Sequence, residues 1–262
     1  MQLYFYIFLI ILFFVTRDIF YPYYKNSQRK KQIARYFQPE WRNFLQEKVL
    51  FYNRLNAEEK QLFENKISGF LLDYNIEGVE TDISDFDKVL VAASAVIPVF
   101  RFSNWYYRDL KTIFLFPDSF TINHPMLPEG TLLNGLVGYG GMVDKMYLSR
   151  KALYESFEKD FDGKHTGIHE FLHLIDMEDG EADGVPDILI PKAYIKPWKQ
   201  LIQNEIERIC NDDSILSDYA CENAAEFFAE SGVLFFENPD ELRAKHPELY
   251  RILELIFMTK TK

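Results

Sequence analysis

The sequence has 262 residues, which is enough for one large domain or two small ones. Its hydrophobic fraction of 48% and charged fraction of 26% are those of a folded globular protein, so a largely disordered chain is excluded. The formal net charge of -11 argues against nucleic acid as a partner, because a phosphate backbone selects basic surfaces.

The N-terminal segment is strongly apolar. An uninterrupted apolar run over 3–15 is followed by a second apolar patch over 19–24. The first run is short for a bilayer span, which needs ~20 residues, but the two patches together are long enough. No basic n-region and no A-x-A-like site mark a cleaved signal peptide. We therefore expect residues 1–24 to anchor the protein in a membrane; the alternative is an aromatic-rich helix packed on the domain.

Basic residues follow this segment closely, at Lys25, Arg29, Lys30 and Lys31. Under the positive-inside rule they leave the rest of the chain in the cytoplasm. We expect 25–40 to be a basic linker and 41–262 to be the functional domain. The expected location is thus a membrane-anchored protein with its domain in the cytoplasm, or a cytoplasmic protein if the anchor is absent.

Helices dominate the predicted domain. Apolar residues at helical spacing predict a helix over 41–72, with a break near Asn56. A segment rich in small apolar residues over 87–100 predicts a buried helix that ends at Pro98. Further amphipathic helices are expected at 198–209, 220–236 and 247–258.

Two short strands are expected among these helices. β-Branched and aromatic residues predict a strand over 110–116, and alternation predicts a second over 142–148. The glycine-rich stretch 130–141 between them is expected to be a loop. The fold class is therefore α+β: a mostly helical domain with a small mixed sheet. The two cysteines, Cys210 and Cys221, do not make a disulfide scaffold, and buried reduced thiols are expected.

The segment HEFLH contains His169 and His173, four positions apart. This spacing places both imidazoles on one face of a helix, where they can hold one side of a Zn²⁺ ion. The adjacent Glu170 can then act as a base on a zinc-activated water. Thr166 is a plausible N-cap, and an apolar stripe supports the helix at Ile168, Phe171, Leu172 and Ile175. The strand at 142–148, if it lies at a sheet edge, can pair with an extended peptide.

A zinc peptidase needs a third protein ligand and leaves the fourth position to water. Glu226 is the preferred candidate, because a second helix crossing the first can present it to the metal. Glu230, four residues later, faces the same way and can orient an imidazole. Tyr219 can donate its hydroxyl to a tetrahedral oxyanion. The alternative for these residues is an ordinary helix with a solvated acidic face and a packed tyrosine ring.

Other candidates for the metal site lie closer in sequence. His165 is one turn before His169, and Asp179 is six residues after His173. A third histidine on one straight helix does not complete a tetrahedron easily, and the turn that would bring Asp179 back lacks glycine. Asp176 suits a carboxylate that is hydrogen-bonded to a ligand imidazole.

Two segments, HEFLHLIDMEDGEADGVP and YACENAAEFFAE, together resemble the Mlc titration factor A family of zinc-dependent peptidases. The second is also similar to a helix of the anthrax lethal factor protease domain. A looser likeness extends over 86–236 and includes FLFPDSF. The resemblance implies a gluzincin-like fold and a Zn²⁺ cofactor. It also implies roles for individual residues: zinc ligands His169, His173 and Glu226, general base Glu170, and a phenol near the reacting carbonyl, Tyr219.

The expected function is a zinc-dependent metallopeptidase, a hydrolase acting on peptide or protein substrates, with aminopeptidase action as one form. The alternative is a non-catalytic regulator, since the resembled family is also associated with sequestering the transcriptional repressor Mlc. Glu170 favours the enzyme, because a pure binder needs the ligands and not the base. A third class, a structural zinc site, needs a fourth protein ligand, for which Cys221 is the only nearby thiol.

Overall fold

The computed structural model describes residues 4, 6, 13, 14, 16–103, 105–123, 128–138, 144–158, 163–210 and 215–258. Its helices are η1 (Thr16–Phe20), α2 (Tyr21–Tyr36), α3 (Pro39–Lys48), α4 (Leu50–Asn53), α5 (Ala57–Asp73), α6 (Asp85–Val96), α7 (Arg150–Glu158), α8 (Thr166–Asp176), η3 (Met177–Asp179), α9 (Lys192–Ile209), η4 (Asp218–Cys221), α10 (Ala224–Glu237), α11 (Pro239–Lys245) and α12 (Pro247–Met258). The strands are β1 (Asn75–Gly78), β2 (Thr112–Phe116), β3 (Gly135–Val137) and β4 (Lys145–Ser149). The mostly helical α+β class with a small mixed sheet is confirmed.

The sheet has the order β1-β2-β4-β3. β1 and β4 run parallel to β2, whereas β3 runs antiparallel to β4. The strand predicted over 142–148 corresponds to β4, although 142 and 143 lie outside the described residues. It is not the edge strand, because it pairs on both sides. The edge strands of the described sheet are β1 and β3, and β3 forms within the stretch 130–141 that was predicted to be a loop.

The predicted helix boundaries hold where local capping specifies them. The break near Asn56 is confirmed, since its side chain accepts the amide of Glu59 in a capping box that starts α5. Ser84 and Asp87 form the same arrangement at the start of α6. Nine residues of α6 are buried, so the expected buried helix is also confirmed.

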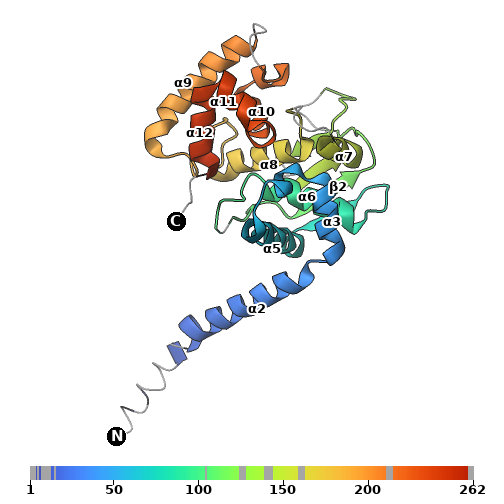
Figure 1. Cartoon of the computed structure of the whole chain (residues 1–262), viewed down its shortest axis with the longest axis vertical. Coiled ribbons are helices and arrows are strands. Elements are labelled where there is room, and N and C mark those ends of the chain that lie inside the picture. Colours follow the sequence, from blue (N-terminus) through green and yellow to red (C-terminus); the bar gives the residue numbers. More distant parts are fainter. Residues whose placement is uncertain are drawn as a thin grey trace.

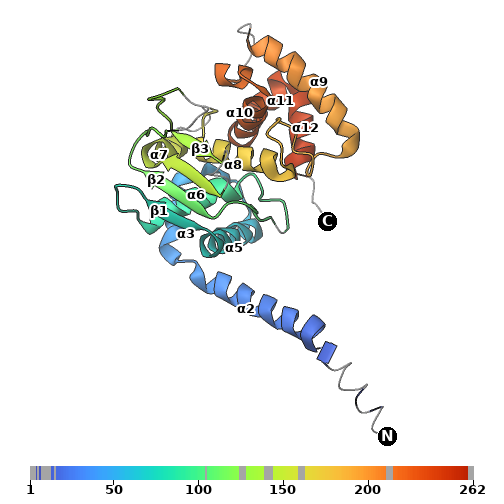
Figure 2. The same ribbon diagram turned by 180° about the vertical axis from the view of Figure 1, so that it is seen from behind.

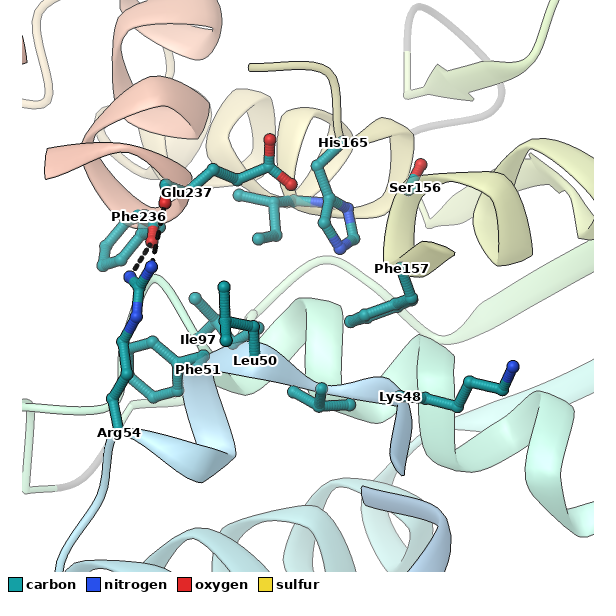
Figure 3. A pocket seen from close by; sticks show the side chains of 12 residues that line it. Lys48, Leu50, Phe51, Arg54, Ile97, Ser156, Phe157, His165, Phe236 and Glu237 are labelled. Atoms are coloured by element: carbon teal, nitrogen blue, oxygen red, sulfur yellow. Dashed lines mark hydrogen bonds between the residues drawn. The ribbon is translucent and has the colours of Figure 1, made fainter. Parts of the chain in front are cut away.

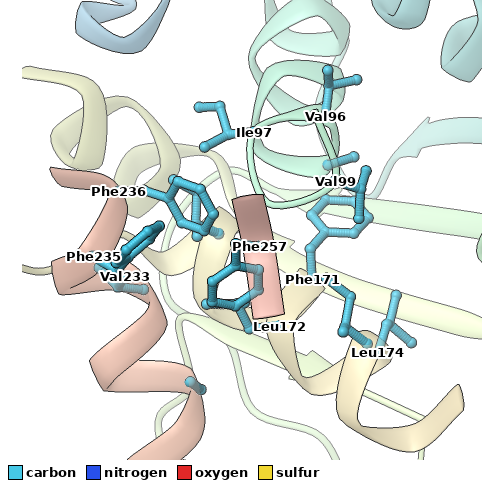
Figure 4. Close-up of a cluster of buried hydrophobic side chains, with 14 of the residues drawn as sticks. Val96, Ile97, Val99, Phe171, Leu172, Leu174, Val233, Phe235, Phe236 and Phe257 are labelled. Carbon is cyan, nitrogen blue, oxygen red and sulfur yellow. The ribbon is translucent and has the colours of Figure 1, made fainter. Parts of the chain in front are cut away.

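Helix α8 runs through the middle of the molecule, between the sheet with α5 and α6 on one side and α9–α12 on the other (Figures 1 and 2). Its buried residues join a single apolar core with side chains from both sides. Figure 4 shows part of this core, in which Phe171 and Leu172 of α8 lie among Ile97, Phe236 and Phe257. Packing from both sides therefore determines where α8 lies.

Helix α10 crosses close to α8 because Gly232 has no side chain. A Cβ added to Gly232 would lie 2.7 Å from Leu172 Cδ1, a separation that real Cβ atoms essentially never show. Gly232 and Leu172 are both fully or almost fully buried, so neither helix has room to shift. The close crossing brings the first turns of α10 to the polar face of α8.

The N-terminal part differs from the prediction. Throughout the described ranges, no helix has both the length and the apolar character needed to cross a membrane. The apolar run over 3–15 lies mostly outside the described residues. The prediction of a membrane anchor, and of the membrane location derived from it, was therefore wrong. One reason is that the charged pair Arg17–Asp18 follows the first patch and α2 then carries polar and basic residues.

The segment predicted as a basic linker is helical over most of its length. It belongs to α2, which projects away from the rest of the molecule in Figure 1. Arg29 attaches α2 to α5, since it donates to the carbonyl of Gly69 and pairs with Asp73. The positive charges of this segment thus contribute a contact to the domain.

Candidate metal centre

Helix α8 is started by His165 and not by the predicted Thr166. The Nδ1 atom of His165 accepts the amide of Ile168 at 3.1 Å, which satisfies one of the free amides at the helix start. The predicted apolar stripe is confirmed, with every member at most 2% exposed: Ile168, Phe171, Leu172 and Ile175. With that stripe in the core, His169 and His173 lie on the face that points toward α10.

Helix α10 brings a carboxylate to these two imidazoles. Asn223 caps the helix by accepting the amide of Glu226 at 3.0 Å, so Glu226 lies in the first turn. Its Oε2 atom is 3.1 Å from His169 Nε2 and 3.3 Å from His173 Nε2. The two Nε2 atoms are 3.0 Å apart. The structure thus brings together the three residues expected to be ligands.

The donor set has the dimensions of a site for a small divalent cation. Ligand bonds of about 2.0–2.2 Å in a tetrahedron place neighbouring donor atoms about 3.3 Å apart. The observed separations are 3.0–3.3 Å. Among the described residues, no fourth His, Cys, Asp or Glu joins this cluster. Three protein donors with one direction left open are typical of a catalytic metal site and not of a closed structural one.

Glu230 orients one of the imidazoles, as expected. Its Oε1 atom is 2.9 Å from His169 Nδ1, so it accepts the Nδ1 proton and leaves Nε2 free to bind a metal. The hydroxyl of Ser217 donates to the other oxygen of Glu230 at 2.5 Å. Sequence reasoning missed Ser217, and no local signal reveals it. It did not consider Asn223 as a cap either, although Asn followed three residues later by Glu is a readable start signal.

The charges at this centre favour a bound cation. Burial opposes a charged His169, but hydrogen bonds with Glu226 and Glu230 outweigh it and raise the pKa of His169 to about 10. Burial also opposes a charged Glu226, yet its contacts with His169 and His173 lower the pKa of Glu226 to about 2. The two carboxylates therefore stabilise a positive charge at the imidazoles, which is supplied either by a proton or by a metal ion.

Glu170 and Tyr219 border the same centre. Glu170 is 7% exposed, and burial raises the pKa of its carboxyl group, while His169 and His173 act in the opposite direction. The ring centroid of Tyr219 lies 5.9 Å from that of His169. Burial and the nearby carboxylates raise the pKa of Tyr219, so its phenol stays protonated and can donate a hydrogen bond. Tyr219 is therefore a hydrogen-bond donor at this centre, and Glu170 binds a proton more tightly than an exposed glutamate does.

His165 faces away from this centre. It lines a separate cavity of about 40 Å³ with residues such as Phe157, Leu50 and Phe236, as Figure 3 shows. Its Nδ1 atom is used in capping, and its Nε2 atom is buried without a hydrogen-bond partner among the described residues. Burial lowers the pKa of His165 to about 3, so it is neutral. His165 is thus not positioned to bind the metal.

The two aspartates considered near the metal have other contacts. Asp176 accepts the amide of Gly184 at 2.9 Å, and its second oxygen is buried with no hydrogen-bond partner in the part of the chain that the structure describes, so it is not bonded to a ligand imidazole. Asp179 accepts the amides of Glu181 and Asp187. Both aspartates therefore shape the loop after α8 and do not complete the centre.

Cys221 cannot supply a fourth ligand, because it is bonded to Cys210 in a disulfide. The expectation of two reduced thiols was wrong, since tertiary packing places their Cα atoms 5.6 Å apart. The bridge connects the end of α9 to η4, the segment that carries Tyr219 and follows Ser217.

Comparison with known proteins agrees with this geometry. The model of the glucose-regulated metallo-peptidase M90 family matches residues 24–258. An uncharacterized protein of Synechocystis sp. is 28% identical over 244 residues, covering 89% of this chain and 88% of its own length. Mlc titration factor A of Pectobacterium atrosepticum is 33% identical over 191 residues, covering 67% of this chain and 69% of its own. Its counterpart in Yersinia enterocolitica is 24% identical over 229 residues, covering 81% and 82%. The resemblance drawn from the motifs is confirmed, and the chain belongs to the glucose-regulated metallo-peptidase M90 family.

Proposed function

We propose that this protein is a zinc-dependent peptidase whose metal is held by His169, His173 and Glu226. The observation that carries the proposal is the convergence of their three donor atoms within 3.0–3.3 Å of one another. Membership of a metallo-peptidase family supports the same reaction class. The ligand set of two histidines from α8 and a glutamate from α10 is that of a gluzincin-like site. The proposed peptidase domain spans 41–262, with α2 as a helical extension.

A bound Zn²⁺ would polarise the scissile carbonyl and make a water molecule acidic enough to react near neutral pH. Glu170 accepts the proton of this water and delivers it to the leaving amine. Burial raises the pKa of Glu170, which favours its acceptance of the water proton. Tyr219 donates its hydroxyl to the oxyanion that develops on the carbonyl. Glu230 holds the His169 ring in its orientation.

Strand β3 offers a place for the substrate backbone. Within the described part of the sheet, β3 pairs with β4 on one side only. Its other side can accept an extended peptide as an added strand. Because α8 packs against β3, such a peptide would lie next to Glu170. This position keeps the expected role of an edge strand but assigns it to β3.

The test is zinc content and peptide hydrolysis of the wild type beside Glu170→Gln and Glu226→Ala. We expect one zinc per chain in the wild type and in Glu170→Gln, loss of zinc in Glu226→Ala, and loss of hydrolysis in both variants. Glu155→Gln, which changes an exposed carboxylate on α7, serves as the control. Full zinc retention in Glu226→Ala would refute the ligand assignment. Peptides with free and blocked N-termini separate aminopeptidase from endopeptidase action.

A second candidate function is capture of a partner protein. The relatives from Pectobacterium atrosepticum and Yersinia enterocolitica are named Mlc titration factor A, a name that points to binding of the regulator Mlc. Glu170→Gln separates the two functions, because a binder keeps its partner affinity without the base. Zinc binding with no turnover on a broad peptide library would favour capture.

A further inference from the structure

Strand β3 and the side chain of Glu170 touch at a residue that has no side chain. A Cβ added to Gly135 would lie 2.2 Å from Glu170 Oε1 and 2.6 Å from its Cδ and Cγ atoms. Any residue larger than glycine at this position would overlap the whole carboxyl end of Glu170. Gly135 does not have a positive φ, so what it supplies is space and not an unusual backbone conformation.

The backbone around Gly135 is held by strand β4, and the side chain of the preceding Asn134 is hydrogen-bonded as well. The backbone carbonyl of Asn134 accepts a hydrogen bond from the amide of Ser149 at 2.8 Å. The side-chain oxygen of Asn134 accepts one from the Ser119 hydroxyl at 2.7 Å. Gly135 itself is opposite Leu148, which is fully buried. Since α8 is equally fixed by the core, a methyl group at position 135 must displace the Glu170 side chain.

We propose that Gly135 is a positioning residue, whose missing side chain holds open the place of the Glu170 carboxylate beside the edge strand. The inference rests on the proposed function, because Glu170 is the general base there. The carboxylate is the end of a flexible side chain, so the methyl group shifts it without unfolding the protein, at a cost in stability that Tm can record. Proton transfer tolerates such a shift poorly: a misplacement of about 1 Å can lower a rate about 100-fold.

The first measurement compares Gly135→Ala with the wild type and with Leu132→Ala, a control at an exposed residue three positions earlier. We expect Gly135→Ala to keep one zinc per chain, because the atoms nearest to the added Cβ belong to Glu170 and not to a ligand. Its kcat should fall about 100-fold with KM changed little, since the chemical step is affected and not substrate binding. Leu132→Ala should behave as the wild type. An unchanged kcat in Gly135→Ala would overturn the proposal.

A compensating pair tests the contact itself. Glu170→Asp withdraws the carboxylate by one methylene and should make room for the methyl group. We expect Gly135→Ala to lower kcat much less in the Glu170→Asp background than in the wild type, a non-additive result. Equal losses in both backgrounds would mean that Gly135 acts by another route, and the proposal would be wrong.

A double-mutant cycle measured by Tm tests the contact between Gly135 and Glu170 independently of the proposed function. Gly135→Ala should lower Tm in the wild type and lower it less in Glu170→Ala, where no carboxyl group is present to be displaced. If the wild type hydrolyses no peptide but this cycle shows coupling, the proposed function fails and the contact stands. If the two Tm changes are equal, the contact between Gly135 and Glu170 is refuted whatever the activity.

Discussion

At the scale of single residues, the centre is a set of buried charges that compensate one another. Glu226 and Glu230 lie on opposite sides of the His169 ring, one near each ring nitrogen. The Nδ1 atom is committed to Glu230, which leaves Nε2 for a metal. A buried carboxylate without such partners would be strongly destabilising, so each of these contacts affects stability and chemistry together.

Glu230→Gln should weaken zinc binding without removing a ligand. The neutral amide is a poorer acceptor for the Nδ1 proton of His169, and changes of this kind lower metal affinity about 10–100-fold. Competition with a chelating dye would measure the dissociation constant. Glu222→Gln, whose side chain is exposed, should leave it unchanged. Equal affinity in Glu230→Gln and the wild type would show that the hydrogen bond does not tune the site.

Asp176 should make stability depend on pH. Burial is the main cause that raises the pKa of Asp176 from 3.8 to about 7, so the folded state holds its proton more tightly than the unfolded state. This contribution is fully present below pH ~4 and is lost as the pH rises to ~7. Asp176→Asn has no such loss, and its stability relative to the wild type should increase over this window by at most about 4 kcal/mol.

Urea unfolding at several pH values, with a chelator present throughout, would measure this difference. The chelator matters because His173 interacts with Asp176 and would respond to metal. Asp187→Asn, at an exposed position in the same loop, should show no comparable pH dependence. A constant difference between Asp176→Asn and the wild type from pH 4 to 8 would contradict the prediction.

At the scale of elements, the centre is built by two helices, by the segment that precedes α10 and by strand β3. α8 supplies the two imidazoles, α10 supplies the two carboxylates, and Gly232 allows them to cross closely. The segment before α10 adds Ser217 and Tyr219, and β3 borders Glu170. No element contains the whole site, so anything that moves α10 or η4 relative to α8 changes the chemistry.

Removing the disulfide should loosen the segment that carries Tyr219. Cys210 and Cys221 are separated by 11 positions, and closing a loop of about this size stabilises a fold by roughly 3 kcal/mol in the chain-entropy model. Cys210→Ser should lose about that much free energy of unfolding. Reductant should lower the stability of the wild type to the same level and leave the variant unchanged. A variant as stable as the oxidised wild type would contradict the prediction.

At the scale of the whole molecule, the centre lies where the sheet-bearing part meets the C-terminal helices. α8 packs against both parts of the molecule, and α10 brings the ligand Glu226 to it (Figures 1 and 2). A metal held between the two helices therefore binds the folded state and not the unfolded chain.

Zinc should accordingly stabilise the entire fold. Free Zn²⁺ at about 100 times its dissociation constant adds about 2.7 kcal/mol, or roughly 5–10 °C in Tm for a chain of this size. A thermal melt with zinc or with chelator measures the shift. His173→Ala should lose most of this response. A response as large as that of the wild type would mean that zinc stabilises the protein from another site.

Local interactions determined what the sequence could reveal. The helix of the HEFLH segment, the break near Asn56, and the strand predicted over 110–116 and found at Thr112–Phe116 depend on hydrogen bonds and periodicity within a few residues. The same locality explains an error: the sequence shows which residues near 165 can cap a helix, but only packing selects His165 over Thr166.

Contacts between distant segments were decided by the tertiary structure alone. Helix geometry and the family resemblance favoured Glu226 as the third ligand. Its position beside His169 depends on the crossing of α8 and α10. The short strand β3 forms because β4 supplies its hydrogen bonds, and the disulfide forms because α9 and η4 meet. Such pairings depend on which surfaces bury each other, and a single segment carries no record of its partner.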